Sequence, residues 1–147
     1  MNNPAELPFF VYGTLRPGEI NHTRRLRGRT AAEEPAHWAH ALLYEGPGYP
    51  YAVEGTPDEP GPGVTGALIT AAPGNYRALL ADLDELEEYT APGHPGNLYE
   101  RVPREITRAD GTPVRAWVYL TPPGPAAALR REGIPIPGGD WCAHPVA

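Results

Sequence analysis

One glutamate stands where its carboxyl could transfer a proton near neutral pH. Glu87 lies near the end of Pro73–Glu88, a segment whose leucines repeat at helical spacing. With Tyr76 at the centre of the apolar stripe, about 100° per residue puts Leu83 and Glu87 within roughly 20° of it. Burial and the negative end of the helix dipole would both raise the pKa of Glu87, as general acid–base catalysis requires. The alternative is a frayed last turn in which Glu87 bends out to solvent.

A second candidate site is Tyr12-Gly13-Thr14-Leu15, directly after an apolar run. A glycine that follows a strand lets successive backbone amides point into one concavity, which can hold a carboxylate without a positive side chain. The same strand–glycine–turn pattern is also common in proteins where it has no binding role.

Other side chains indicate little chemistry. The chain has no lysine, which excludes Schiff-base catalysis and lysine-linked pyridoxal phosphate. One cysteine, Cys142, excludes an intrachain disulfide framework, and the five histidines show no ligand spacing. His37 and His40 are expected on opposite faces of one strand. We therefore expect no metal and no cofactor. Four clustered arginines are interpreted as a solvated face: Arg24, Arg25, Arg27 and Arg29.

The elements that must position these residues are short apolar runs divided by glycine and proline. Strands are predicted over Leu7–Tyr12, His37–Tyr44, Tyr51–Val53, Val64–Thr70, Tyr99–Thr107 and Val114–Leu120, with an Asp-Gly turn joining the last two. Helices are predicted over Glu19–Leu26, Pro73–Glu88 and Ala126–Arg131. This order predicts an α+β fold, a small mixed β-barrel of about six strands flanked by short helices.

Composition narrows the class of protein. The 147 residues suit one domain, which we expect over 6–142, and the net charge of −6 argues against nucleic acid as a partner. The 17 glycines and 20 prolines come close to the composition of disordered chains, but they fall between apolar runs and so divide structure. No apolar run is long enough to cross a membrane and no secretion signal begins the chain, so a cytoplasmic location is expected.

Three motifs carry a family resemblance. FVYGTLRPG (Phe10–Gly18) followed by Asn21-His22, then LDELE (Leu83–Glu87) and LYER (Leu98–Arg101), resemble the γ-glutamylcyclotransferase-like family, which includes γ-glutamylamine cyclotransferase and AIG2-like proteins. The resemblance runs from about Pro8 to Trp141. It implies a small mixed barrel with a pocket at one end. It also implies roles for individual residues, with Glu87 as catalytic acid/base, Tyr99 as a pocket-lining residue, and a substrate-binding loop formed by Tyr12, Gly13, Thr14 and Leu15.

The family reaction converts a γ-glutamyl amine or amide into 5-oxoproline and the free amine, without metal or organic cofactor. The resemblance therefore implies a small-molecule γ-glutamyl substrate, and we expect a monomer or homodimer. Two departures border the pocket: Glu88 stands where relatives often carry glycine, and the segment 88–97 is longer than in some members. These departures leave the identity of the leaving group open. They also leave open the alternative that activity has been lost. The alternatives are an enzyme that removes a γ-glutamyl protecting group in a biosynthetic pathway, or a catalytically silent module that binds a small carboxylate.

Overall fold

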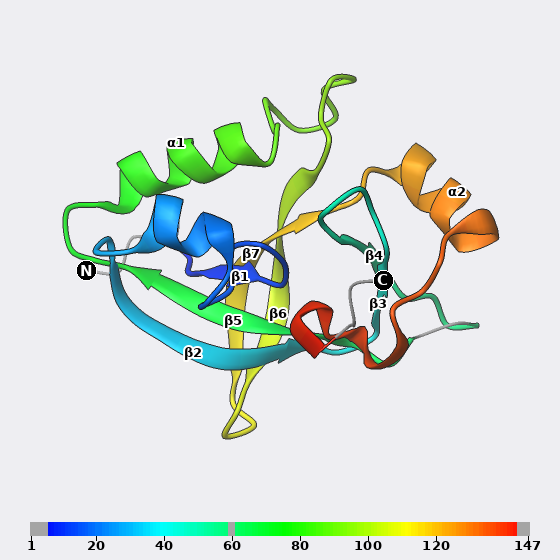
Figure 1. The fold of residues 1–147 in the computed structure, drawn as a ribbon, viewed down its shortest axis with the longest axis horizontal. Helices are drawn as coiled ribbons and strands as arrows, with labels where there is room; N and C mark the ends of the chain where they lie inside the picture. Colours follow the sequence, from blue (N-terminus) through cyan, green and yellow to red (C-terminus); the bar gives the residue numbers. More distant parts are fainter. Residues whose placement is uncertain (1–5, 59–60, 144–147) are drawn as a thin grey trace.

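The computed structural model describes residues 6–58 and 61–143. Within these residues, five strands form a closed barrel (Figure 1) in the order β1-β5-β2-β6-β7. Their bounds are Phe9–Val11 for β1, Thr30–Trp38 for β2, Val64–Ala71 for β5, Glu100–Arg108 for β6 and Pro113–Leu120 for β7. The α+β class and the mixed barrel expected from the sequence are thus confirmed.

The barrel closes where β1 pairs in parallel with β7, while the other strand pairs are antiparallel. Every residue of β1 is buried, because one face points into the barrel and the other lies under helix α1. Phe10, Leu68, Ile106 and Val118 fill the interior. This buried β1 ends at the predicted substrate loop and so fixes where that loop begins.

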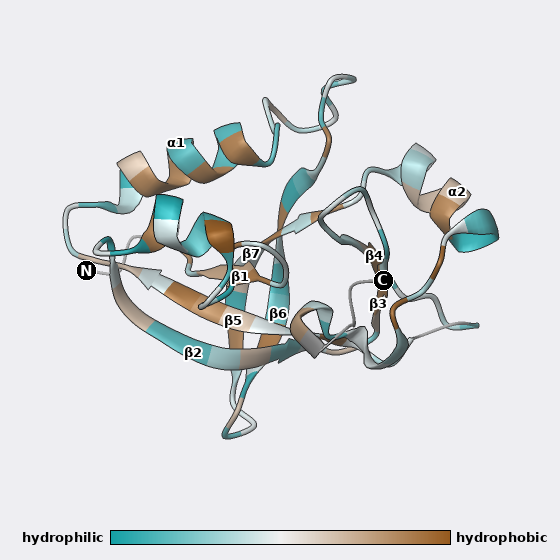
Figure 2. Cartoon of the chain, in the orientation of Figure 1, coloured by the Kyte–Doolittle hydropathy of each residue, from teal (hydrophilic) through white to brown (hydrophobic). Residues whose placement is uncertain are grey.

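Helix α1 (Tyr76–Leu86) lies across the outer face of the barrel beside the short helical turn η1 (His22–Leu26). Its brown, hydrophobic side faces the strands in Figure 2. Leu79 and Leu83 are completely buried there, as the predicted stripe requires. The helix begins later than the predicted start at Pro73, since Asn75 is its N-cap.

A separate two-stranded sheet joins β3 (Ala41–Tyr44) to β4 (Tyr51–Glu54). Its residues pack against α2 (Pro123–Glu132) in a small apolar cluster. Two short turns follow, η2 (Pro137–Gly139) and η3 (Trp141–Ala143). None of the helices in the described residues is long and apolar enough to span a membrane.

The predicted strand His37–Tyr44 is wrong, because the chain turns at His40, where φ is 57°, between β2 and β3. His37 and His40 therefore do not share one strand. The sequence pattern also does not predict the part of β2 that precedes His37. Its central Pro35 lacks an amide hydrogen, and it is tolerated because β2 pairs with β6 only at Ala36 and His37.

Candidate active site

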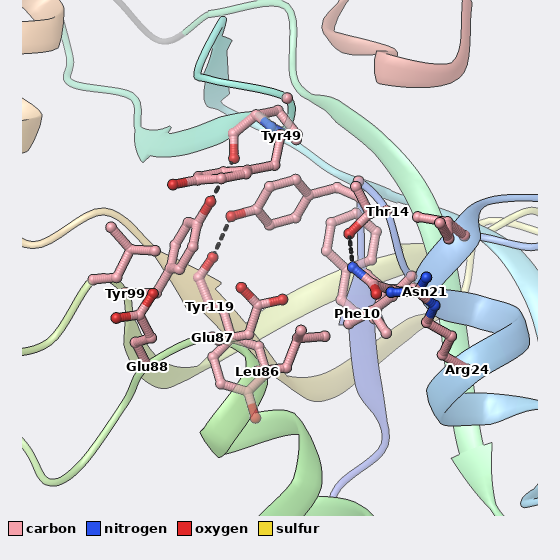
Figure 3. Close-up of a pocket in the computed structure, with 18 residues that line it drawn as sticks. Phe10, Thr14, Asn21, Arg24, Tyr49, Leu86, Glu87, Glu88, Tyr99 and Tyr119 are labelled. Atoms are coloured by element: carbon pink, nitrogen blue, oxygen red, sulfur yellow. Dashed lines mark hydrogen bonds between the residues drawn. The ribbon is translucent and has the colours of Figure 1, made fainter.

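A cavity of about 330 Å³ lies among the loop after β1, the end of α1 and the start of β6. All the predicted site residues line it: Tyr12, Gly13, Thr14, Leu15, Glu87 and Tyr99. In Figure 3, Glu87 points into the space between Tyr99 and Phe10. The fold thus brings together residues from three distant segments.

The position of Glu87 is set by the way α1 ends. The Tyr89 N–H donates to the Asp84 carbonyl at 2.9 Å, and the Glu88 N–H donates to the Glu85 carbonyl at 3.2 Å. These two bonds form a Schellman motif, with Glu87 as the C-cap and Glu88 in the left-handed region at φ 53°. The helix end is therefore ordered, and Glu87 turns toward the cavity rather than out to bulk solvent.

Burial is the main reason that the pKa of Glu87 rises from its usual 4.5 to about 7, and the charge of Glu88 adds to the effect. The carboxyl keeps some exposure, because it faces the open cavity. Within the described residues it belongs to none of the ion pairs. A carboxyl without a compensating cation is poised to exchange a proton near neutral pH.

Three tyrosines line the cavity with this carboxyl, and their hydroxyl groups donate to other acceptors. Tyr12 donates to the Tyr119 carbonyl, Tyr99 to the Pro50 carbonyl at 2.7 Å, and Tyr119 to Asp84 Oδ1 at 2.7 Å. Burial, with a contribution from the charge of Glu87, raises the pKa of each tyrosine well above its usual range. Each neutral hydroxyl has one proton, which is already donated, so its oxygen can act toward a ligand only as an acceptor.

A charged pair holds Tyr119 in place. Asp84 Oδ1 also accepts a hydrogen bond from Arg101 Nε at 2.8 Å. The Arg101 guanidinium lies 4.4 Å from the ring centroid of Trp117, a cation–π contact. These contacts connect α1, β6 and β7 behind the cavity wall.

The loop after β1 presents backbone donors on the other side of the cavity. In the described part of the chain, the N–H groups of Gly13, Thr14 and Leu15 donate to no protein acceptor. Asn21 holds this loop twice: its N–H donates to the Thr14 carbonyl at 3.0 Å, and its side-chain amide donates to Thr14 Oγ1 at 2.8 Å. The free N–H groups can therefore hold an anion in a fixed place.

Gly13 is required by a close approach rather than by its φ angle. A Cβ at this position would lie 2.8 Å from Pro50 Cδ and 3.0 Å from Pro50 Cγ, atoms of a rigid ring. Pro50 in turn accepts the hydrogen bond from Tyr99. The contact therefore fixes the substrate loop, the 48–50 turn and Tyr99 relative to one another.

The arginine cluster does not behave as one solvated face. Arg24 is exposed but lines the cavity, on the Thr14–Asn21 side in Figure 3. Arg29 forms an ion pair with Asp82 at 2.7 Å. The interpretation of the cluster as solvent-facing is therefore confirmed for Arg24, which is exposed although it also lines the cavity, and wrong for Arg29, which is half-buried in its ion pair because η1 lies beside α1.

Of the 88–97 segment, only Glu88 lines this cavity among the described residues, and Leu98, which directly follows the segment, lines it too. Asn97 fixes the segment by accepting from the Thr90 N–H at 2.8 Å and donating to the Ala91 carbonyl at 2.8 Å. Residues near its middle border a second hollow of about 760 Å³ near α2. The 88–97 segment therefore touches the candidate active site through Glu88.

Comparison with known proteins identifies the family. The profile of the family "Gamma-glutamyl cyclotransferase, AIG2-like" matches residues 9–143. A curated relative from Niallia circulans, gamma-L-glutamyl-butirosin B gamma-glutamyl cyclotransferase, is 33% identical over 115 residues. The match covers 76% of this chain and 64% of that relative, so this chain spans less than two thirds of its length.

Two solved structures share the fold. The protein YkqA from Bacillus subtilis has a TM-score of 0.61 at 22% identity, covering 92% of this chain and 39% of that protein. An AIG2-like protein from Mus musculus has a TM-score of 0.60 at 21% identity, covering 96% of this chain and 85% of that protein. The barrel, the cavity beneath the end of α1 and the family profile over residues 9–143 lead to one conclusion: the chain belongs to the AIG2-like gamma-glutamyl cyclotransferase family.

Proposed function

We propose that the protein is a γ-glutamyl cyclotransferase that converts a γ-glutamyl amine or amide into 5-oxoproline and the free amine, with Glu87 as general acid and base. The α-ammonium of the glutamyl group gives a proton to Glu87, and the neutral nitrogen attacks the γ-carbonyl carbon. A C–N bond closes the five-membered lactam. The C–N bond to the leaving amine then breaks as Glu87 returns the proton to the departing nitrogen. The regenerated Glu87 carboxylate then takes the second proton from the ring nitrogen and passes it to the amine, which leaves as an ammonium ion. Atoms and charge balance without water or a cofactor.

The two sides of the cavity support one orientation of the glutamyl group. Its α-carboxylate suits the free N–H groups of Gly13, Thr14 and Leu15, with Arg24 nearby. Its α-ammonium suits the acceptor oxygens of Tyr12 and Tyr99. This orientation puts the ammonium beside Glu87, whose charge contributes to the pKa shifts of both tyrosines.

The raised pKa of Glu87 is the observation that carries the proposal. An α-ammonium has a pKa of roughly 8, so transferring its proton to a carboxylate of ordinary pKa 4.5 is uphill by about 5 kcal/mol. With the pKa of Glu87 at about 7, the same transfer is uphill by about 1.4 kcal/mol. Burial of this one carboxyl therefore brings the proton donor and acceptor close to balance. The rest of the rate advantage comes from holding the amine and carbonyl of one molecule in a folded conformation.

A finer version of the proposal concerns the leaving amine. The curated relative from Niallia circulans is named for a γ-glutamylated butirosin, at 33% identity. This supports a role for the present chain in removing a γ-glutamyl protecting group from a biosynthetic intermediate. The catalytically silent module is less favoured, because a carboxylate acceptor without its own cation is an unfavourable feature in a site that binds only anions.

The test is a panel of γ-glutamyl compounds, including γ-L-glutamyl-butirosin B and simple γ-glutamyl amides, with 5-oxoproline measured by mass spectrometry. We expect product from at least one compound and a loss of about 10²–10⁴ in kcat with Glu87→Gln. Glu85→Gln is the matched control, because Glu85 is exposed on the same helix end. Glutamyl binding without product from any compound would favour the silent module. Activity that survives Glu87→Gln would remove Glu87 from the mechanism.

A further inference from the structure

This inference rests on the proposed function and concerns the leaving amine, whose end of the cavity is lined by Glu88. Glu88 directly follows the C-cap of α1, lines the cavity and is exposed. Within the described residues it forms no ion pair. Its carbonyl accepts from the Leu98 N–H at 3.0 Å, which holds its backbone against the start of β6. The backbone at Glu88 is thus held at the cavity edge, and its carboxylate is an uncompensated charge among the described residues.

The backbone conformation at this position does not suit a glutamate. Its φ of 53° lies in the left-handed region, where a side chain is unfavourable and glycine is preferred at a helix end. Local structure therefore gives no reason for a glutamate at position 88. A reason must come from what the carboxylate meets.

Aromatic rings accompany Glu88 at this end of the cavity. Tyr49 and Tyr99 line it, and Tyr51 packs on both, with ring centroids 5.6 Å from Tyr49 and 5.7 Å from Tyr99. The charge of Glu88 contributes to the raised pKa of Tyr51, so the carboxylate acts on this group of rings. A carboxylate beside phenol rings is a suitable environment for an organic cation.

The two ends of the cavity also carry opposite charges. Arg24 and Glu88 lie on opposite sides of Glu87 in Figure 3, with Arg24 on the side of the free N–H groups. A glutamyl α-carboxylate at the Arg24 end leaves the amine half of the substrate directed toward Glu88. A second positive charge on that amine would meet the Glu88 carboxylate.

We propose that Glu88 is a specificity-determining residue that selects γ-glutamyl substrates whose leaving amine carries a second, cationic group. The substrate class is therefore a mono-γ-glutamylated diamine or polyamine-like compound rather than a γ-glutamyl amino acid. The net charge of −6 favours the same class, because it attracts cations toward the protein.

The experiment compares three γ-glutamyl compounds of similar length, made from 1,4-diaminobutane, n-pentylamine and 5-aminopentanoate. Their leaving amines end in an ammonium, a methyl and a carboxylate group. For the wild type we expect kcat/KM to fall in that order, with about a two- to fivefold preference for the ammonium over the methyl compound. Glu88→Gln should abolish this preference, whereas Glu85→Gln should keep it. Raising the salt concentration should reduce it.

The ratio of the two substrates on one enzyme isolates the role of Glu88. Glu88→Gln also changes the pKa of Glu87, but that change affects both substrates equally and cancels in the ratio. Equal kcat/KM values for the ammonium and methyl compounds in the wild type would overturn the inference, and so would a preference that survives Glu88→Gln.

A binding measurement separates this inference from the proposed function. Calorimetry on Glu87→Gln gives the Kd ratio of the ammonium and methyl compounds without turnover. A cation preference in binding with no 5-oxoproline from the wild type would sustain the role of Glu88 and refute the cyclotransferase proposal. Turnover with no cation preference in either measurement would sustain the cyclotransferase proposal and refute the role of Glu88. No binding and no turnover would refute both.

Discussion

Replacing Glu87 by glutamine should stabilise the protein at alkaline pH, because the wild-type carboxyl must ionise in a partly desolvated position. Glutamine has nearly the same shape and never ionises. We therefore expect the difference in free energy of unfolding between Glu87→Gln and the wild type to grow as the pH rises. A catalytic group kept in an unfavourable environment reduces stability in this way.

The size of this stability change follows from the pKa of Glu87, which is about 7 in the folded chain, whereas an unperturbed glutamate has a pKa of 4.5. A raised folded-state pKa means that the native protein binds the proton more tightly than the unfolded chain. Its stability is therefore full below pH 4.5 and falls as the pH rises through about 7. Integration over this window gives a loss of about 3 kcal/mol by pH 8, an upper value because the carboxyl reaches cavity water.

Urea unfolding followed by tryptophan fluorescence at pH 4.5 and pH 8 measures this effect. The offset at pH 4.5 reports any packing difference between glutamine and protonated glutamate, and the change between the two pH values reports ionisation. Glu85→Gln should differ from the wild type by less than about 0.5 kcal/mol at both pH values, as for other exposed positions. If Glu87→Gln and the wild type showed the same pH dependence, the carboxyl would not be desolvated and the reasoning would be refuted.

Three further substitutions test the framework around the cavity. Glu88→Gly should raise the free energy of unfolding by about 0.5–1 kcal/mol by relieving the left-handed backbone, whereas Glu88→Ala should not; equal effects in urea unfolding would contradict the conformational argument. Gly13→Ala should lower stability by about 1–3 kcal/mol and raise KM, since the new Cβ meets Pro50; unchanged stability and KM would show that the loop moves freely. Tyr119→Phe should lower stability by about 1–2 kcal/mol, because Asp84 loses a donor; an unchanged unfolding midpoint in urea would mean that the hydrogen bond contributes nothing.

Much of the fold could be predicted because its strongest signals are local. The stripe of α1 and the hairpin between β6 and β7 both follow from periodicity and from an Asp-Gly turn. The first part of β2 could not be found in this way. None of its residues before Ala36 is buried, and they include Glu33, Glu34 and Pro35, so the alternation that marks a half-buried strand is absent.

The residues of the candidate site also differ in whether a local sequence signal marks them. Glu87 and Gly13 stand out in the sequence, one by its place on an apolar stripe and the other by following a strand. In the sequence, Tyr119 has no feature beyond those of an ordinary strand residue. Its place in the cavity wall depends on the pairing of β7 with β1, which closes the barrel. Pro50 is found only through its contacts in the structure, with Gly13 and with the Tyr99 hydroxyl. Asn21 did have a signal, since it follows the loop motif at fixed spacing, but its hold on Thr14 needed coordinates.

The central claim is that the desolvated Glu87 carboxyl accepts the substrate proton. The pH dependence of kcat/KM for 5-oxoproline release tests it most directly, because kcat/KM reports ionisations of the free enzyme. We predict an acidic limb with a pKa of about 7 in the wild type, shifted to lower pH in Glu88→Gln, where the charge that helps to raise it is gone. A limb near 4.5, or one that Glu88→Gln leaves unmoved at about 7, would contradict the account.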